Sequence, residues 1–344
     1  MKEAYFKELG TPDVIKIHEV PDPVPGPGEV LVRTHAVDIG RADVNYRRGF
    51  YPWPQFLPAV PGWEGSGVVE KLGEGVTNVS VGQPVYLVTM LTSPGDEGRG
   101  FGREKLVVPA HKLVVVPEGV DLDDAATAGY YAMAWCALRE GYGGKPRADQ
   151  KHPGALPGTL LQIGAAGAFG TGFVQVAKAL GITVIGTVSG DEKAEFARAS
   201  GADHTINYRT EDVHARVLEL TNGRGVDMIV DHIGGDEFGK YFETLAPFGT
   251  ILVLNLEKGD AGVDLLQPVV YSKRWPAVRY FGAIGLGEVP DEMKAHSEAV
   301  LDLMAKGKLR PRIGTTFPLD KVVEAQTLVE NGTLGYVLLQ LNRG

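Results

Sequence analysis

The pattern of apolar and polar residues changes along the chain near residue 159. Before it, short valine-rich runs such as EVLVRTHAV, GSGVVEKLG, QPVYLVTM and KLVVVPEG are separated by turn signals such as PGPGE, GEGVTN and PEGVD. Runs of this length between Gly and Pro clusters are typical of strands. Residues 1–125 are therefore predicted to form a β-barrel or β-sandwich.

From Thr159 onward, apolar runs alternate with segments of helical periodicity. The runs TLLQIGA, TVIGTVS, HTINY, VDMIVDHIG and GTILVLN read as strands, and AFGTGFVQVAKALG, DEKAEFARASG, EDVHARVLELTNG and DEFGKYFETLAPFG read as the helices between them. This alternation predicts an α/β fold with a doubly wound parallel sheet. Two further helices, DEMKAHSEAVLDLMAKGKL and LDKVVEAQTLVENG, and a closing strand, GYVLLQL, are predicted after it. A polar linker, YGGKPRADQKHPGALPG, precedes the first strand of the sheet.

A glycine-rich loop, LQIGAAGAFGTG, joins the first strand of this sheet to its helix. Small residues let the backbone approach a pyrophosphate, and the amides at a helix N-terminus donate hydrogen bonds to it. The loop predicts dinucleotide binding by Gly167, Ala168, Phe169 and Gly170; the alternative is a tight turn with no ligand.

The end of the second strand indicates which dinucleotide is bound. Enzymes for NAD usually place Asp or Glu there, about 20 residues after the glycines, to hold the ribose hydroxyl. This chain has Ser189 at that place and Lys193 in the next helix, which suits a 2′-phosphate and predicts NADPH. Asp191 and Glu192 fall beyond the strand and are expected to cap the helix. The alternative for Lys193 is a solvated surface charge.

Composition narrows the class of protein. The chain has 344 residues, 44% of them hydrophobic and 22% charged, with a formal net charge of −9. This is enough chain for two folded domains, and the charge argues against nucleic acid and anionic membranes as partners. The N-terminus lacks the apolar core of a signal peptide, so a cytoplasmic protein is expected. The single cysteine, Cys136, excludes an internal disulfide and is interpreted as a small buried hydrophobe.

The run IGAAGAFGTGFVQVAKALGITVIGTVSGDEKAEFARASGADHTINYRTEDV resembles the zinc-independent NADPH:quinone oxidoreductases of the medium-chain dehydrogenase/reductase superfamily. VPDPVPGPGEVLVRTHAVDIGRADVNYRRGFYP and VPGWEGSGVVEKLGEGVTNVSVGQPVY extend the resemblance to the N-terminal segment. It implies a GroES-like β-barrel catalytic domain at 1–125, completed by about 285–344, and a Rossmann domain at 126–284. It also implies a homodimer, and it adds Tyr208, Arg209 and Asn255 to the cofactor-binding residues.

Zinc-dependent members of the superfamily carry a Gly-His-Glu motif and a cysteine in the N-terminal domain. This chain reads Gly62, Trp63, Glu64 there, and that domain has no Cys. A catalytic zinc needs three protein ligands of suitable type, so no metal site is predicted.

Without zinc, the chemistry that fits is hydride transfer from NADPH to an electron-poor acceptor, a quinone or an activated enone. The candidate catalytic and substrate residues are Asp43, Asn45, Tyr46, Tyr51 and His232. Relatives commonly have Asn at the position of Gly40, and a histidine bonded to backbone is the alternative for His232. Two other functions stay open. One is an enoyl-thioester reductase with a basic groove formed by Arg41, Arg47 and Arg48, and the other is a non-catalytic NADPH-binding sensor or structural protein.

Overall fold

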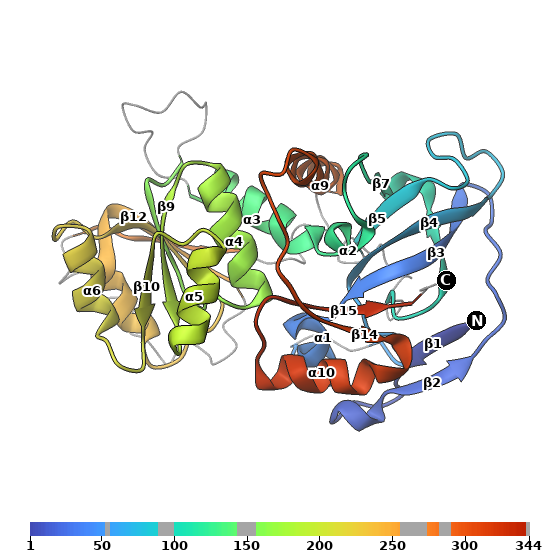
Figure 1. Cartoon of the computed structure of the whole chain (residues 1–344), viewed down its shortest axis with the longest axis horizontal. Helices are drawn as coiled ribbons and strands as arrows, with labels where there is room; N and C mark the ends of the chain where they lie inside the picture. Colours follow the sequence, from blue (N-terminus) through green and yellow to red (C-terminus); the bar gives the residue numbers. More distant parts are fainter. Residues whose placement is uncertain (52–55, 89–99, 143–155, 255–273, 282–289, 342–344) are drawn as a thin grey trace. The chain divides into compact units, whose positions relative to one another are not determined.

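The computed structural model describes residues 1–51, 56–88, 100–142, 156–254, 274–281 and 290–341 (Figure 1). The chain divides into two compact units. Unit 1 comprises Met1–Ala132 and Leu286–Gly344, and unit 2 comprises Met133–Gly285. In the described part of the chain, no helix is both long and apolar enough to cross a membrane.

Unit 2 contains a six-stranded sheet in the order β10-β9-β8-β11-β12-β13. Every neighbouring pair in this sheet is parallel. The strands are β8 (Thr159–Gln162), β9 (Thr183–Val188), β10 (His204–Asn207), β11 (Val226–Asp231), β12 (Leu245–Val253) and β13 (Ala277–Tyr280). This is the strand order of a doubly wound dinucleotide-binding fold, and the predicted parallel sheet is confirmed.

Three helices connect the first four of these strands: α4 (Ala168–Ala179), α5 (Asp191–Ala199) and α6 (Val213–Leu220). In Figure 1 they lie beside the sheet, and α4 is buried along most of its length. All six residues of β11 are buried. A strand that is buried along its whole length, rather than at alternate positions, is typical of a parallel sheet covered on both faces.

The fourth predicted helix of this unit is wrong over half its length. Only Phe238–Thr244 is helical, as the 3₁₀-helix η4, and LAPFG is already part of β12. The reason is Pro247, which has no amide to donate and which forces Ala246 before it into extended geometry. Strand β13 was not predicted at all, because AVRY is too short and too polar to show a pattern.

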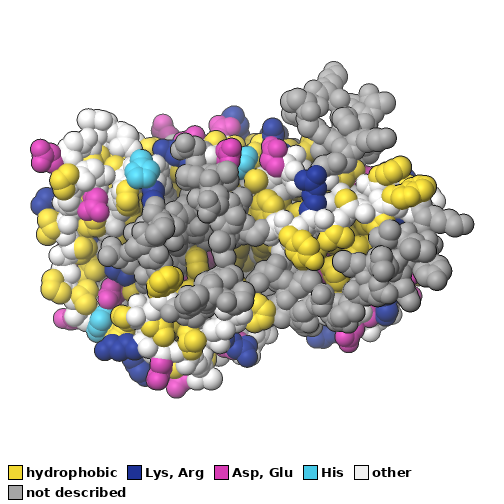
Figure 2. All heavy atoms as spheres, turned by 180° about the vertical axis from the view of Figure 1, so that it is seen from behind, with side chains coloured by type: hydrophobic (Ala, Val, Ile, Leu, Met, Phe, Trp, Pro, Cys, Tyr) yellow, Lys and Arg dark blue, Asp and Glu magenta, His cyan; other side chains and the backbone are white. Residues whose placement is uncertain are grey.

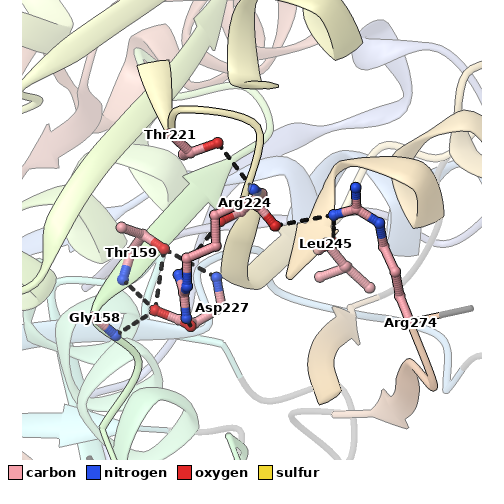
Figure 3. A network of polar contacts seen from close by, with 8 residues as sticks. Gly158, Thr159, Thr221, Arg224, Asp227, Leu245 and Arg274 are labelled. Carbon is pink, nitrogen blue, oxygen red and sulfur yellow. Dashed lines mark hydrogen bonds and ion pairs between the residues drawn. The ribbon is translucent and has the colours of Figure 1, made fainter. Parts of the chain in front are cut away.

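A polar network ties together the amino ends of β8, β11 and β12 (Figure 3). Oδ2 of Asp227 accepts the amides of Gly158 and Thr159 at 2.8 and 2.9 Å, and its other oxygen pairs with Arg224. Arg274 donates to the carbonyl groups of Arg224 and Leu245. This network holds the amino ends of the strands. The loops described below follow the carboxyl ends of the strands, on the opposite side of the sheet.

Unit 1 is built on a seven-stranded sheet in the order β14-β15-β3-β4-β5-β7, with β6 paired to β3. The strands are β3 (Glu29–Asp38), β4 (Glu64–Leu72), β5 (Pro84–Val88), β6 (Lys105–Pro109), β7 (Val114–Val115), β14 (Ile313–Pro318) and β15 (Tyr336–Gln340), and a separate pair is formed by β1 (Lys2–Tyr5) and β2 (Lys16–Glu19). Its apolar core includes Phe6, Val32, Val37, Leu87 and Phe101. The predicted β-rich segment is confirmed.

Helices that the valine-rich pattern did not reveal also belong to unit 1. These are α1 (Arg41–Arg47), α2 (Leu122–Ala125) and the first turns of α3 (Ala128–Glu140). The first of them, α1, begins where the side chain of Asp43 accepts the amide of Gly40 at 2.9 Å. That contact satisfies an amide at the helix start, which is the usual role of an acidic residue at the third helical position.

The C-terminal segment supplies α9 (Pro290–Ala305), α10 (Val322–Asn331) and β15, so both predicted helices and the closing strand are confirmed. Strand β15 pairs with β3 near the start of the chain. Arg47 of α1 is fully buried and reaches Gln326 and Glu330 of α10 at 2.6 and 3.0 Å. Residues far apart in sequence therefore complete one unit.

Candidate functional site

Three glycines at the junction between β8 and α4 have three different geometric roles. Gly164 has φ +71°, a conformation that L-residues rarely adopt. A Cβ at Gly170 would lie 2.1 Å from the carbonyl oxygen of Gly164, so only glycine lets α4 pack this closely on the turn that follows β8. At Gly167, by contrast, φ is −80° and no non-adjacent heavy atom lies within 4 Å of the position of a Cβ. The space in front of Gly167 is where a ligand can approach the backbone.

The loop is held against the neighbouring strand. The amide of Gly164 donates to Oγ1 of Thr187 at 3.0 Å, and the amide of Ala165 donates to the carbonyl of Thr187 at 3.0 Å. Gly167 is the N-cap of α4 and has no side chain to cap it. The amides of the first helical turn, from Ala168 to Gly170, have no acceptor within the helix and suit a pyrophosphate.

The other predicted cofactor residues follow the carboxyl ends of β9 and β10, at the same edge of the parallel sheet. Ser189 follows β9 directly, Lys193 lies in the first turn of α5, and Tyr208 and Arg209 follow β10 with both side chains exposed. Gly190, between β9 and α5, again has open space where a Cβ would point. The edge thus offers small residues next to hydroxyl and basic groups, which fits a phosphorylated dinucleotide.

Two details at this edge differ from expectation or fall outside the structure. The N-cap of α5 is Gly190, so Asp191 and Glu192 do not cap the helix but occupy its first turn. Negative charge is still favourable there, because the N-terminal end of the helix dipole is positive. Asn255 lies outside the described residues.

His232 lies against the glycine-rich loop. Its ring centroid is 4.4 Å from that of Phe169, and its Cε1 would be 3.3 Å from a Cβ on Gly164. The preceding Asp231 fixes this turn, because its Oδ1 accepts the amides of Ile233 and Gly234 at 2.8 and 3.0 Å. The structure therefore brings His232 to the cofactor loop, and its catalytic role stays a prediction.

Among the predicted residues of unit 1, Asp43 is buried, and its carboxylate connects two segments of the backbone. Its carboxylate accepts the amide of Gly62 at 2.6 Å as well as that of Gly40. Burial raises its pKa to about 7, although these hydrogen bonds and the charge of Arg47 act in the opposite direction. Asp43 thus joins the start of α1 to the segment that precedes β4.

The three neighbouring candidates differ in what their side chains contact. The Tyr46 hydroxyl donates to the carbonyl of Phe56 and accepts its amide at 2.8 Å, so it is engaged by the chain itself. Asn45 is buried, and its Nδ2 has no hydrogen-bond partner among the described residues. Tyr51 is half-buried and packs on the core of unit 1. Their substrate-binding roles stay predictions.

A group of buried polar residues in unit 1 was not recognised from the sequence. Asp38 and Glu64 are partners in the β3–β4 register, and each is at most 3% exposed. Glu64 accepts the hydroxyl of Tyr86 at 2.8 Å and the amide of Gly129 at 2.5 Å. The only signal in the sequence is an acid at one end of each of two apolar runs, and the register that makes them face each other is a tertiary property.

Burial raises the pKa of both acids, because neither can be hydrated when charged. The pKa of Glu64 rises to about 7. That of Asp38 is raised further above its usual range by burial, by the charges of Glu64 and Asp43, and by its hydrogen bond to Glu64. Asp38 is therefore the member of the pair that carries a proton near neutral pH.

The arginines considered for a basic groove are bound to α10. Arg47 is buried against Gln326 and Glu330, Arg48 pairs with Glu330 at 3.3 Å, and Arg41 donates to the carbonyl of Glu330 at 3.2 Å. Figure 2 shows basic and acidic side chains interspersed over the described surface of one face. Binding of an acidic carrier through these arginines is thus unsupported, and the expected absence of nucleic acid as a partner stays a prediction.

Trp63 occupies the place of the histidine ligand of zinc-dependent relatives, and its ring packs on the core of unit 1 with its centroid 5.5 Å from that of Tyr46. Within the described ranges, one group of three side chains could offer ligand atoms within 4.8 Å of one another: His35, Asp121 and Asp123. Nε2 of His35 and Oδ1 of Asp123 are 3.1 Å apart, and Asp121 caps α2. The expected absence of a metal site stays a prediction.

Two family models match the chain. The alcohol dehydrogenase GroES-like domain matches residues 26–118, and the zinc-binding dehydrogenase model matches residues 168–295. The first match falls on the β-rich part of unit 1, and the second starts at α4 of unit 2.

Individual relatives match over nearly the whole chain. A quinone oxidoreductase of Pseudomonas aeruginosa is 33% identical, with 98% of this chain and 99% of the relative covered. A 2-haloacrylate reductase of a Burkholderia species is 34% identical, with 98% of each covered. The solved structure of Escherichia coli quinone oxidoreductase complexed with NADPH is 28% identical and has a TM-score of 0.85, with 99% of this chain and 100% of that chain covered.

Proposed function

The chain belongs to the zinc-independent quinone oxidoreductases of the medium-chain dehydrogenase/reductase superfamily, and we propose that it is an NADPH-dependent reductase of quinones or activated enones. The observation that carries this proposal is the loop at Gly167, which is open to a ligand and lies at the same sheet edge as Ser189 and Lys193. The alternative function, an enoyl-thioester reductase, required a basic groove. The arginines considered for that groove are bound to α10, so this alternative is unsupported.

The residues of unit 2 would hold the cofactor. The amides from Ala168 to Gly170 suit the pyrophosphate, and Ser189, Lys193, Tyr208 and Arg209 would surround the 2′-phosphate. When bound, NADPH supplies a hydride to the electron-poor carbon of the acceptor. His232, which packs on the loop, would help to position the nicotinamide half.

In unit 1, the proposed task is to hold the acceptor and to balance the charge that hydride transfer creates. The Tyr51 hydroxyl is proposed to donate to the carbonyl oxygen of the acceptor, since Tyr51 is half-buried and a phenol is a suitable donor to a developing oxyanion. Asp43 would fix the turn that precedes these residues. Asn45 has a buried amide that is not satisfied by the described chain, and it is proposed to face the acceptor.

The test is NADPH oxidation measured with a panel of quinones and conjugated enones, and with 2-haloacrylates because of the Burkholderia relative. We expect turnover with at least one acceptor, and an affinity for NADPH more than about tenfold above that for NADH. Tight NADPH binding without turnover of any acceptor would instead support a non-catalytic sensor. Equal affinities for the two cofactors would contradict the assignment of Ser189 and Lys193.

A homodimer is proposed to form through β13, which is the outer strand of the described sheet of unit 2. Tyr280 of this strand is 79% exposed, and the exposed rings of Trp275 and Phe248 stack with centroids 5.5 Å apart. An exposed edge with large apolar side chains is a site for pairing with a second chain. Light scattering should give a dimer, and Tyr280→Asp should shift it toward monomer. A wild-type monomer at all concentrations would contradict this proposal.

A cytoplasmic location stays a prediction from the sequence.

A further inference from the structure

We propose that Asp38 and Glu64 together hold one proton inside unit 1, and that Tyr130 passes this proton to the product when the acceptor has taken up hydride. The inference rests on the proposed function. Tyr130 would be the catalytic residue, and Asp38 and Glu64 would act through it.

The geometry of the sheet places the two acids face to face. Asp38 and Glu64 are directly opposed in antiparallel strands, a relation that brings Cβ atoms within about 4.5–5.5 Å. Two carboxylates opposed in this way repel each other, and neither is exposed enough for water to screen the repulsion. One shared proton removes the repulsion, as in other buried carboxyl pairs.

The two acids differ in how their oxygens are used. Glu64 accepts two hydrogen bonds, from Tyr86 and from the amide of Gly129 at the start of α3, so it is arranged as the ionised partner. Oδ1 of Asp38 has no hydrogen-bond partner among the described residues. Its hydrogen bond to Glu64 joins it only to the other acid of the pair. A buried acid that costs stability and supports no other part of the fold is better explained by a functional proton.

Further polar groups surround the pair on the same face of the sheet. Tyr336 of β15 is fully buried, its hydroxyl has no hydrogen-bond partner among the described residues, and the charges of Glu64 and Asp38 help to raise its pKa. The register aligns β15 with β3 through Leu338 and Asp38, which puts Tyr336 diagonal to Asp38. The groups that act on Asp38 and Glu64 come from β3, β4, β5, α1 and α3, and the charged groups that act on them are other acids, Asp43 among them.

Tyr130 of α3 has its hydroxyl next to this interior group. A Cβ placed on Gly40 would lie 2.5 Å from the Tyr130 hydroxyl and 3.5 Å from Oδ2 of Asp38, so both oxygens converge on the space that Gly40 leaves free. Tyr130 is only partly buried as a residue. Burial, the charges of Asp38, Glu64 and Asp43, and the presence of Tyr51 all raise its pKa, which keeps its hydroxyl protonated and able to donate.

The proposed step is balanced in atoms and charge. The acceptor receives two electrons and one hydrogen as hydride from NADPH, and the anion formed takes the hydroxyl proton of Tyr130. Tyr130 then regains a proton from Asp38, which leaves both carboxyls ionised. A proton from water restores the pair, so each turnover consumes one NADPH and one proton.

The first test measures the proton on the pair without any turnover. Infrared spectra of the wild type at pH 7.5 should show a carbonyl band of a protonated carboxyl group that Asp38→Asn removes. Glu118→Gln, at an exposed glutamate, is the control and should leave the band in place. Identical spectra of wild type and Asp38→Asn would overturn the proposal, whatever the enzyme reduces.

The second test measures delivery of the proton. Tyr130→Phe should lower kcat by about 100-fold, the scale of a lost general acid, and should leave NADPH binding unchanged. Tyr131→Phe is the matched control: Tyr131 is the next residue of α3, fully buried, with a hydroxyl that has no partner among the described residues. Wild-type kcat should fall as pH rises through the titration of the pair, and Asp38→Asn should be slow and lack this dependence.

The outcomes separate this inference from the proposed function. Equal kcat values for Tyr130→Phe and Tyr131→Phe, on an acceptor that the wild type reduces, would overturn proton delivery while the reductase function stands. No oxidation of NADPH by any acceptor would remove the proposed function and proton delivery together. The infrared band would still decide whether the pair holds a proton.

Discussion

The two units build their candidate sites from opposite materials. In unit 2 the site is backbone: Gly164, Gly167 and Gly170 bring amides to a surface that is open to a ligand. In unit 1 the site is side chains, with Asp38, Glu64 and their neighbours buried in a sheet. A backbone site depends on the absence of side chains, because a ligand must reach the amides. A side-chain site depends on which polar groups the fold places together.

This comparison is tested most severely by Gly167→Val. Methyl groups would fill the open space at the N-terminus of α4, so NADPH affinity should fall by more than about 100-fold, or about 3 kcal/mol. Because φ of Gly167 is −80°, the substitution adds no left-handed strain, and the apo protein should melt as the wild type does. Fluorescence titration measures the affinity. Gly170→Val is the contrasting variant, since its side chain would collide with the Gly164 carbonyl and destabilise the fold itself. Unchanged NADPH binding by Gly167→Val would mean that this loop does not face the cofactor.

A second prediction concerns the acids of unit 1 and the free energy of unfolding. The pKa of Glu64 is about 7 in the folded protein against 4.5 unperturbed, so the folded state binds more protons between these values. Stability is then lost as pH rises from about 4.5 to about 7 and is level above it, by about 3 kcal/mol for this group. Urea unfolding at several pH values should show that the free energy of unfolding of Glu64→Gln, relative to that of the wild type, increases by about this amount between pH 5 and pH 8. A constant difference between the two proteins would contradict the buried-acid description.

Lys193→Ala addresses the phosphate end of the cofactor site. Loss of one charged hydrogen bond should weaken NADPH binding by about 1–3 kcal/mol and leave NADH nearly unchanged. Isothermal titration with both cofactors distinguishes this from a general effect. An equal loss for NADPH and NADH would assign Lys193 to the structure of α5 rather than to the phosphate.

The smallest expected effect is that of a chelator, which should leave NADPH oxidation unchanged. Trp63 stands where zinc-dependent relatives have a histidine, and it packs on the core of unit 1. Elemental analysis of the purified protein should find less than stoichiometric zinc. One zinc per chain together with activity lost on chelation would show that metal chemistry operates here after all.

The same contrast explains what could be predicted from the sequence. The glycine-rich loop and the five strands around it were identifiable because spacing and period are local properties. Ser189 and Lys193 were predicted from their distance to the loop, and their contacts with the cofactor stay a prediction. Asp38 and Glu64 were not, since they are opposed only through the β3–β4 register. Pro247 was visible in the sequence, and its effect on the helix before β12 could have been anticipated.

The position of β15 has a consequence for the order in which the protein can fold. Residues 133–285 leave the ribosome as one continuous stretch, so unit 2 can complete its sheet during synthesis. Unit 1 cannot complete its sheet during synthesis, because β3 pairs with β15 and Arg47 pairs with Glu330, and both partners are synthesised near the end of the chain. Until the last strand emerges, the side of β3 that will pair with β15 is exposed to solvent. The guanidinium of Arg47, which is buried in the folded protein, is exposed as well. The nascent chain therefore passes through a stage in which its cofactor-binding half is finished and its other half still needs protection from aggregation.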